Sequence, residues 1–449
     1  MTGGRLLTGW GGTAPTRATV LSSGDGPALA EAVRYAGERG VIARGLGRSY
    51  GDAACNGGGI VVNMTARADV LAWDLDRGLI SVEAGLSLNE LLALAIPHGW
   101  FVPVLPGTGQ VTIGGAISAD VHGKNHHAGG TFCRHVASFD LLTADGLVRT
   151  VTPNADFEVF WATAGGMGLT GLVLRATVRL VQVETAWMVV DTERAADLDT
   201  VLAELADGDE RYPYSAAWVD LGTGGARTGR GVLTRGRHAR RDDLPPAMRS
   251  GSLLYRPRHQ LTVPPGVPRQ VLNRCSLSMF NEAWYRRAPR HRRGELQPMS
   301  DFLYPLDAVG RWNRLYGSRG FVQYQFVLPF GAEVALRRVV AQITASKHAP
   351  FLAVLKRLGS ADPGPLSFPI AGWTLALDLA ASPELGPLLD QLDDLVAEAG
   401  GRVYLAKDAR MRASVLPRMY SRLDDFRAIR EALDPRRVFN SDLARRLAL

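Results

Sequence analysis

The chain is poor in lysine although it is rich in positive charge. Only four of its 51 basic residues are lysines, and its net charge is +7. Arginine preserves charge at most surface sites, so lysine is expected to persist where a compact ammonium does what a guanidinium cannot. We therefore expect a function at Lys124 and Lys407, expect none at Lys347, and leave Lys356 open between the two interpretations.

Cysteine and long apolar runs are also scarce. Cys55, Cys133 and Cys275 are odd in number and far apart, which excludes a disulfide framework and a cysteine zinc site. No run of about 18 apolar residues occurs, and the most apolar stretch, 91–105, is interrupted by prolines and a glycine. Residues 1–20 show no apolar signal core and no twin arginine, so no signal peptide is expected. A soluble protein is expected, with peripheral membrane contact left open.

What is present indicates two domains. The chain has 449 residues, of which 46% are hydrophobic and 21% charged, as in a globular protein too long for one ordinary core. Helix and strand patterns alternate up to about residue 185, which is typical of an α+β nucleotide-binding domain. Polar loops at 224–250 and 256–269 then separate strands and longer helices, which predicts a sheet with helices on one face. The predicted helices are 27–40, 87–97, 114–121, 155–162, 331–347 and 383–399, and the predicted strands are 41–44, 60–63, 80–83, 136–143, 171–183, 215–221 and 321–328.

Two glycine-dense loops, Ala43–Asp52 and Pro106–Gly115, are the most informative motifs. Neither has the G-K-[ST] of a Walker loop or the spacing G-x-G-x-x-G. Glycine lets the backbone approach a ligand closely, and consecutive N–H groups bind anions. Two such loops in one domain predict a long ligand with a diphosphate in its middle, which the N-terminus of the helix at 114–121 would face.

Histidines and a lysine follow the second loop. His122 and Lys124 flank a glycine directly after the predicted helix, where side chains would meet the reactive ring of a cofactor. His126 and His127 invite a metal interpretation. No carboxylate or cysteine completes a ligand set, so we predict no metal site.

Two further motifs lie towards the C-terminus. Gln323 and Gln325 would share one face of a strand, where their amides would bind sugar hydroxyls or face solvent. Tyr404 and Lys407 lie at the end of an apparent strand, and a surface salt bridge is the alternative explanation for that pair.

Arginine clusters at 235–241 and 286–293 are interpreted as solvated mobile loops. No nucleic-acid-binding motif accompanies them, so no nucleic-acid partner is expected. Contact with an anionic lipid surface is the second interpretation, since each basic residue close to a bilayer contributes about 1 kcal/mol.

Together these motifs resemble the FAD-binding enzymes of the vanillyl-alcohol-oxidase type and, within them, the family of decaprenylphosphoryl-β-D-ribose 2-oxidases. The block HGKNHH at 122–127 is specific, whereas the glycine loops mark only the superfamily. The likeness covers nearly the whole chain. Further motifs that carry it lie at 7–11, 160–171, 323–325, 365–369, 404–408 and 441–446.

The resemblance implies an α+β, two-domain vanillyl-alcohol-oxidase/p-cresol-methylhydroxylase-type FAD-binding fold. An FAD-binding domain at 1–185, joined by a returning C-terminal segment at 404–449, would enclose a sheet-based substrate domain at 186–403. FAD would be bound non-covalently, although His122 matches the position where some superfamily members attach it. The implied FAD-binding residues are Ala43, Arg44, Gly45, Leu46, Gly47, Arg48, Ser49, Tyr50, Gly51, Asp52, Gly107, Thr112, Ile113, Gly114, Gly115, Ser118, His122, Val173 and Tyr404.

The implied reaction is oxidation of the ribose 2-hydroxyl of decaprenylphosphoryl-β-D-ribose to a ketone, with hydride passing to the flavin. Tyr50, His122 and Lys124 are candidates for the network that removes the hydroxyl proton, and Lys407 is a candidate cation that stabilises negative charge. A NADPH- or NADH-dependent short-chain reductase would complete the epimerisation to the arabinose donor for cell-wall arabinan. The implied substrate-binding residues are Tyr304, Gln323, Gln325, Lys356, Thr374, Ala376 and Lys407.

Two positions depart from the family pattern. Thr374 replaces an asparagine and Ala376 replaces a cysteine. Without the thiol, covalent nitroaromatic inhibitors are expected to bind at most reversibly. Because the asparagine amide is absent, substrate recognition stays open. The alternative function is that of a related FAD-dependent sugar or aldonolactone oxidase that acts on a different free or prenyl-linked sugar. The other alternative is a basic binding protein that catalyses no reaction. The expected location is peripheral, at the cytoplasmic or the periplasmic face of the plasma membrane.

Overall fold

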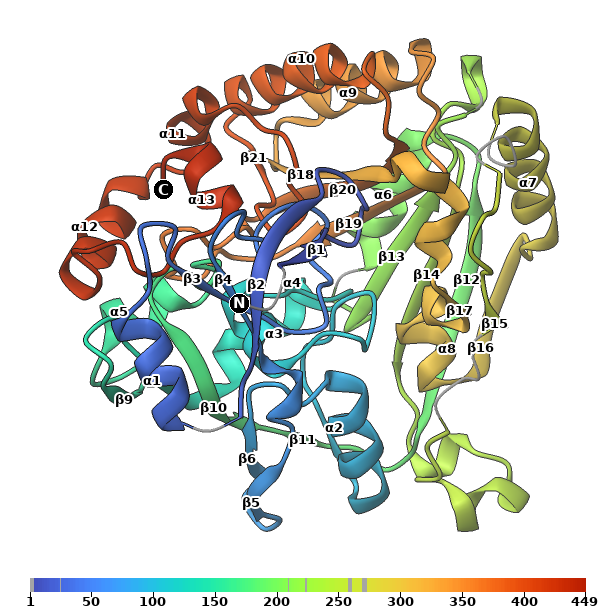
Figure 1. Ribbon diagram of the computed structural model, residues 1–449. Coiled ribbons are helices and arrows are strands. Elements are labelled where there is room, and N and C mark those ends of the chain that lie inside the picture. Colours follow the sequence, from blue (N-terminus) through green and yellow to red (C-terminus); the bar gives the residue numbers. More distant parts are fainter. Residues whose placement is uncertain (1–3, 25, 209, 223, 257–260, 269–272) are drawn as a thin grey trace.

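This computed structural model describes residues 4–449 apart from 25, 209, 223, 257–260 and 269–272. Three larger sheets, of four, five and eight strands, organise the chain (Figure 1). Within the described ranges, no helix combines the length and the apolar character needed to cross a bilayer.

The first glycine loop leaves a small four-stranded sheet. β4 (Ile60–Asn63) lies in parallel between β2 (Thr16–Ser22) and β3 (Val41–Arg44), and β1 (Arg5–Leu7) is the antiparallel edge strand. The loop follows the carboxyl end of β3, where parallel strands commonly present ligand-binding loops. Helix α1 (Gly26–Arg34) buries Leu29 and Val33 in the cluster that also contains residues of β3 and β4. It ends before residue 40 because Gly37 and Gly40 close a turn.

The second glycine loop lies against a five-stranded antiparallel sheet. Helix α2 (Leu88–Ala95), which precedes this loop in the chain, begins with the predicted capping box. In it the Glu90 carboxylate accepts a hydrogen bond of 2.9 Å from the Ser87 N–H. Helix α3 (Ile113–Ser118) contacts β10, and α5 (Phe157–Thr163) follows the sheet's last hairpin. The strands, in sheet order, are β5 (Val70–Asp74), β6 (Leu79–Glu83), β10 (Leu172–Arg179), β8 (Val136–Leu142) and β9 (Val148–Val151). The strand predicted at 171–183 is divided between β10 and β11 (Val181–Gln182), which pairs with β7 (Trp100–Phe101).

The third sheet has eight strands and lies within residues 187–403. Helices α6 (Leu198–Gly208), α9 (Glu333–Ala345) and α10 (Leu385–Glu398) contact its strands, as predicted for a helix-covered sheet. In order, the strands are β16 (His291–Pro298), β12 (Trp187–Ala195), β14 (Gly231–His238), β13 (Tyr214–Val219), β19 (Leu352–Leu358), β20 (Gly372–Ala380), β18 (Phe321–Pro329) and β21 (Arg402–Val403).

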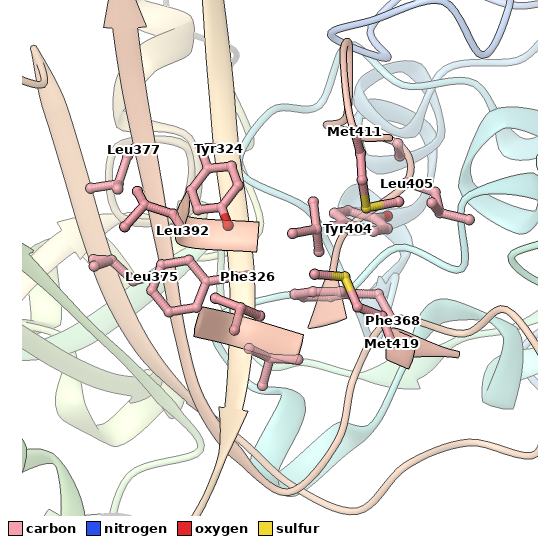
Figure 2. Close-up of a cluster of buried hydrophobic side chains, with 14 of the residues drawn as sticks. Tyr324, Phe326, Phe368, Leu375, Leu377, Leu392, Tyr404, Leu405, Met411 and Met419 are labelled. Atoms are coloured by element: carbon pink, nitrogen blue, oxygen red, sulfur yellow. The ribbon is translucent and has the colours of Figure 1, made fainter. Parts of the chain in front are cut away.

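The helix-covered face of this sheet is apolar. Tyr324 and Phe326 of β18 lie beside Leu377 and Leu375 of β20, their register partners, and Leu392 of α10 packs against them (Figure 2). Side chains alternate along a strand, so the residues between these point to the opposite face. That opposite face is directed at the N-terminal glycine loops.

Two arginine-rich segments that were predicted to be mobile loops belong largely to regular structure. Strand β14 runs through the loop predicted at 224–250, and its Arg235 is only 4% exposed because Glu193 and Glu204 neutralise it. The last turn of α7 (Arg274–Arg287) and the start of β16 cover most of 286–293. The prediction was wrong at Arg235 because the carboxylates that pair with it lie on other elements. At 286–293 the arginines are exposed, as predicted, but most of them belong to a helix and a strand. Part of the loop predicted at 256–269 lies outside the described residues, and β15 (Leu261–Thr262) occupies part of the rest, paired with β17 (Val309–Gly310).

The C-terminal residues return to the first sheet. Phe439 forms a parallel bridge with Val41 at the start of β3. The Asp442 carboxylate accepts a hydrogen bond from the Gly57 N–H at 2.9 Å, and Arg446 pairs with Asp52 at 2.8 Å. The helices of this segment are α11 (Leu416–Met419), α12 (Leu423–Leu433) and α13 (Asp442–Leu447). The domain bounds drawn from the sequence remain a prediction.

Candidate active site

A cavity lies between the two glycine loops and the polar face of the third sheet. Its empty space, counted out to its opening into solvent, is about 1780 Å³. Its lining extends from the first glycine loop to the strands of the third sheet, so one long ligand would contact both walls.

Most of the predicted residues line this cavity. From the N-terminal part these are Ala43, Gly45, Leu46, Gly47, Arg48, Ser49, Tyr50, Gly107, Thr112, Gly114, Gly115, Ser118, His122 and Val173. From the third sheet and the segment after it these are Gln323, Gln325, Lys356, Ala376, Tyr404 and Lys407. The two glycine loops thus meet at one site, as their pairing predicted.

Glycine is required where the loops touch each other. A Cβ on Gly45 would overlap the side chain of Thr112, and Gly47 has a φ of +66°. Thr112 cannot move freely, because it is the N-cap of α3 and accepts a hydrogen bond of 3.2 Å from the Gly115 N–H. The wall on this side is therefore backbone.

The charges of the loop suit an anionic cofactor. Asp52 is paired with Arg446, so it adds no free negative charge. Arg48 lines the cavity, and its buried Nε has no hydrogen-bond partner among the described residues. A backbone wall with an unpaired guanidinium N–H fits a diphosphate.

His122 lies where the two walls meet. It is 6% exposed, and Gln325 donates to its Nε2 at 2.9 Å. Burial, together with the positive charge that Lys356, His126 and Lys407 carry when protonated, holds the pKa of His122 well below its usual range. The imidazole is therefore neutral with its hydrogen on Nδ1, which has no partner within the part of the chain that the structure describes.

The polar face of the third sheet carries the predicted glutamines together with Lys356. Gln325 is the register partner of Ala376, and Lys356 is the register partner of Thr374. Gln323 and Gln325 both line the cavity, which confirms that they share a face. Thr374 itself lies behind the wall, where its hydroxyl accepts from Gln325 at 3.2 Å and donates to the Phe326 carbonyl at 2.9 Å.

Two of the chain's four lysines, Lys356 and Lys407, line this end of the cavity, and Lys124 lies close enough for the charge of Lys356 to act on it. Burial, with Lys356 adding to it and Asp378 opposing it, lowers the pKa of Lys407 to about 7. Burial also lowers the pKa of Lys356 to about 8 and, with the charge of Lys356, that of Lys124 to about 7. The Lys407 Nζ lies 3.9 Å from the ring centroid of Tyr50. An anion placed here would raise all three pKa values, so the cluster favours an anionic ligand.

Seven predicted residues do not line the cavity. Arg44 donates to the carbonyls of Thr8 and Ala54, and so orders the loop from behind. Lys124 donates to the Phe302 carbonyl and lies 4.4 Å from its ring centroid. The remaining five are Gly51, Asp52, Ile113, Tyr304 and Thr374, of which Gly51 meets Asp408, Ile113 belongs to an apolar cluster and Tyr304 is buried near Gly109.

Some residues of the site were missed. Asp378 is 1% exposed, accepts a hydrogen bond of 2.6 Å from Gln323, and its other oxygen has no hydrogen-bond partner among the described residues. Burial raises the pKa of Asp378 to about 7, against the effects of Gln323 and Lys407. Asp378 lies two residues after Ala376 on the same strand. Alternation of side chains along that strand would therefore have placed it on the same face as Ala376. Asp307, which accepts a hydrogen bond of 2.6 Å from Thr108, also lines the cavity, and no sequence motif around it pointed to that position.

Comparisons with known proteins agree with this geometry. The family described as FAD binding domain matches residues 19–152, and the family described as D-arabinono-1,4-lactone oxidase matches residues 376–447. Decaprenylphosphoryl-beta-D-ribose oxidase of Mycolicibacterium smegmatis is 46% identical over 99% of this chain and 98% of its own. L-gulono-1,4-lactone dehydrogenase of Mycobacterium tuberculosis is 25% identical over 93% of each chain. Delta(24)-sterol reductase of Rattus norvegicus is 29% identical over 27% of this chain and 23% of its own.

These matches confirm the family resemblance, the two-domain α+β fold of the vanillyl-alcohol-oxidase type and FAD as the cofactor. The chain is an FAD-dependent oxidoreductase. The role of each side chain in the cavity stays a prediction.

Proposed function

This chain belongs to the decaprenylphosphoryl-β-D-ribose oxidase family, and we propose that it oxidises the ribose 2-hydroxyl of decaprenylphosphoryl-β-D-ribose to a ketone. The observation that supports this most directly is that Lys356 and Lys407 line the same end of the cavity as the two amides Gln323 and Gln325, which share one sheet face. Ammonium groups bind a phosphate, and amides bind sugar hydroxyls. The same cavity continues into the backbone wall that fits FAD.

The chemistry divides between the cofactor and this chain's side chains. Bound FAD supplies the two-electron oxidant that removes the hydride from the sugar carbon. Lys407 stabilises negative charge on the sugar oxygen as its proton leaves. Neutral His122 donates from Nδ1, and Tyr50, whose pKa is raised well above its usual range by burial, stays a phenol. Contact with a cation and hydrogen-bond donors lowers the pKa of the sugar hydroxyl. Its proton would then pass along the predicted network of Tyr50, His122 and Lys124 to water as the hydride leaves.

Binding of the substrate is assigned to the sheet face. Gln323 and Gln325 orient the sugar, and Lys356 binds its phosphate. Tyr304 and Lys124 lie behind the lining residues. Because Lys124 is hydrogen-bonded to the Phe302 carbonyl, its place in the proton network requires its side chain to turn. FAD is proposed to bind non-covalently between the glycine loops, with Val173 and Tyr404 beside it.

The product determines which enzyme must act next. A 2-keto sugar becomes the epimer when hydride is returned from the other face, so we propose a nicotinamide-dependent short-chain reductase as the functional partner. The two steps would supply the arabinose donor for cell-wall arabinan. A lipid-linked substrate also places the enzyme in peripheral contact with the plasma membrane.

The test is anaerobic stopped-flow mixing of the purified yellow protein with farnesylphosphoryl-β-D-ribose. We expect rapid bleaching of the flavin absorbance and formation of a 2-keto product. Bleaching by a free aldonolactone, with none by the lipid-linked ribose, would instead favour the sugar or aldonolactone oxidase. A flavin that neither compound bleaches would direct the search to other prenyl-linked sugars, with Thr374 as the first position to examine.

A further inference from the structure

Helix α7 and the turn after it, residues 274–293, form a surface that the proposed reaction does not use. We call this surface the α7 face; α7 lies at the outer edge of the molecule, beyond the third sheet (Figure 1). Met279, Phe280 and Trp284 are 74%, 45% and 47% exposed. Large apolar side chains that gather on a surface mark a site of interaction.

The α7 face is also strongly basic. It contains six arginines and one acidic residue. Arg286 pairs with Glu282 within the helix at 2.6 Å. Arg287, Arg290 and Arg293 are exposed, and no carboxylate within the described ranges pairs with them. Unpaired arginines beside exposed aromatic rings are the composition of a segment that lies on an anionic lipid surface.

A line of ring contacts leads from this face to the cavity. Trp284 stacks on Phe280, with ring centroids 6.1 Å apart, and Phe280 stacks on Phe351 at 5.9 Å. Phe351 meets Tyr316 at 6.0 Å, and Tyr316 meets Trp312, which lines the cavity, at 6.4 Å. The exposed aromatic residues are therefore connected to the cavity wall through a series of packed rings, of which Tyr316 and Trp312 are buried.

We propose that the α7 face docks the enzyme on an anionic bilayer, with Met279, Phe280 and Trp284 in the interfacial layer and the unpaired arginines at the headgroups. Trp284 favours that layer because its ring leaves water while its indole N–H remains hydrated, and Met279 and Phe280 add apolar surface that leaves water. The inference rests on the proposed function in one respect: a lipid-linked substrate lies in the bilayer, so the enzyme has to dock there to reach it.

The other arginine cluster provides a matched control. At 235–241, Arg235 is buried and Arg237 pairs with Asp243 at 2.7 Å, which leaves Arg240 and Arg241 exposed. Arg290 and Arg292 lie level with the first half of β14, because the Arg194 N–H donates to the Arg290 carbonyl and Thr192 is the register partner of both Arg292 and Thr234. Arg240 and Arg241 follow the end of that strand, so the two clusters lie at different positions along it.

The experiment measures co-sedimentation of the FAD-loaded enzyme with vesicles. Wild type and the control variant R240Q/R241Q are expected to bind vesicles of phosphatidylcholine and phosphatidylglycerol more strongly than vesicles of phosphatidylcholine alone. The triple variant R287Q/R290Q/R293Q should lose affinity about a hundredfold, since each arginine near an anionic surface contributes about fivefold. The variant M279S/W284S should also bind less, and a retained flavin spectrum shows that each variant is folded.

Three results would overturn the proposal: wild type that does not bind the anionic vesicles, a triple variant that binds as wild type does, or ultracentrifugation showing that the α7 face is covered by a second copy without lipid. Flavin reduction by the short-chain substrate in detergent should be unchanged in the triple variant. If the enzyme bound vesicles but lipid-linked ribose did not reduce its flavin, the proposed function would be contradicted. The proposed docking surface would still be supported.

Discussion

The cofactor half of the cavity is walled by backbone, whereas the sheet half is walled by side chains. At the cofactor half, loops 43–52 and 106–115 approach so closely that Gly45 has no room for a Cβ. At the sheet half, Gln325, Lys356 and Ala376 come from three neighbouring strands and meet only through strand register. The first wall gives shape and amide donors, and the second gives charge and hydrogen bonds to the reacting sugar.

The difference explains where the two walls tolerate change. A backbone wall is sensitive to any added atom, because the positions of its N–H groups determine how it binds a ligand. A side-chain wall keeps its shape when one side chain changes, since the strands hold the others in register. Substitutions in the first half should therefore affect cofactor retention, and substitutions in the second half should affect turnover with the cofactor still bound.

The largest effect that would sharpen this contrast is expected at Lys407. The variant K407A should retain FAD but reduce it about 10²–10³-fold more slowly, the usual loss when one group that stabilises an oxyanion is removed. Single-turnover stopped-flow measures this rate. The exposed Lys347 offers the control K347A, which should behave as wild type. Wild-type reduction rates in K407A would show that Lys407 has no part in the chemistry.

The next effect is expected at Gly45, on the backbone wall. The variant G45A forces a Cβ into the Thr112 side chain, and an overlap of this kind costs about 1–3 kcal/mol. We expect FAD affinity to fall about ten- to hundredfold, measured by flavin release on dilution. The control is G386A, because a Cβ at Gly386 meets nothing within 4 Å. If G45A retained FAD but lost turnover, the division between the two walls would be broken.

A pH profile tests the charge on the sheet wall. If the ammonium form of Lys407 is required, kcat/KM should be highest below its pKa of about 7 and fall as the pH rises through that value. The variant D378N keeps an acceptor for Gln323 but removes the negative charge that stabilises the Lys407 ammonium. The fall of kcat/KM with rising pH should therefore occur about one pH unit lower. A rate that instead rises through pH 7 would make neutral Lys407 the active form.

The smallest effect is expected at Thr374, behind the wall. The variant T374V removes the hydroxyl that accepts from Gln325, and a hydrogen bond of this kind contributes about 1 kcal/mol. KM for the lipid-linked ribose should rise about fivefold with FAD affinity unchanged. T374S keeps the hydroxyl and should restore wild-type binding. Equal KM values in both variants would show that Gln325 is oriented without Thr374.

The sequence by itself determined the local features. Glycine spacing identified both cofactor loops, Ser87 and Glu90 identified a helix start, and alternation placed Gln323 and Gln325 on one face. Each of these depends on residues within a few positions of one another, where backbone sterics and periodicity act directly. The scarcity of lysine also carried information, because two of the four lysines, Lys356 and Lys407, line the cavity.

Only the tertiary structure decided the long-range pairings. Arg235 is read from sequence as a loop residue, yet Glu193 and Glu204 make it a buried strand residue. Likewise, nothing local to Asp378 shows that it lies near Lys407, or that Lys124 turns to Phe302 instead of the cavity. A charge's partner and its solvent exposure are set by chain segments that are distant in sequence. The pKa values that govern this site therefore exist only once the sheet and the loops have come together.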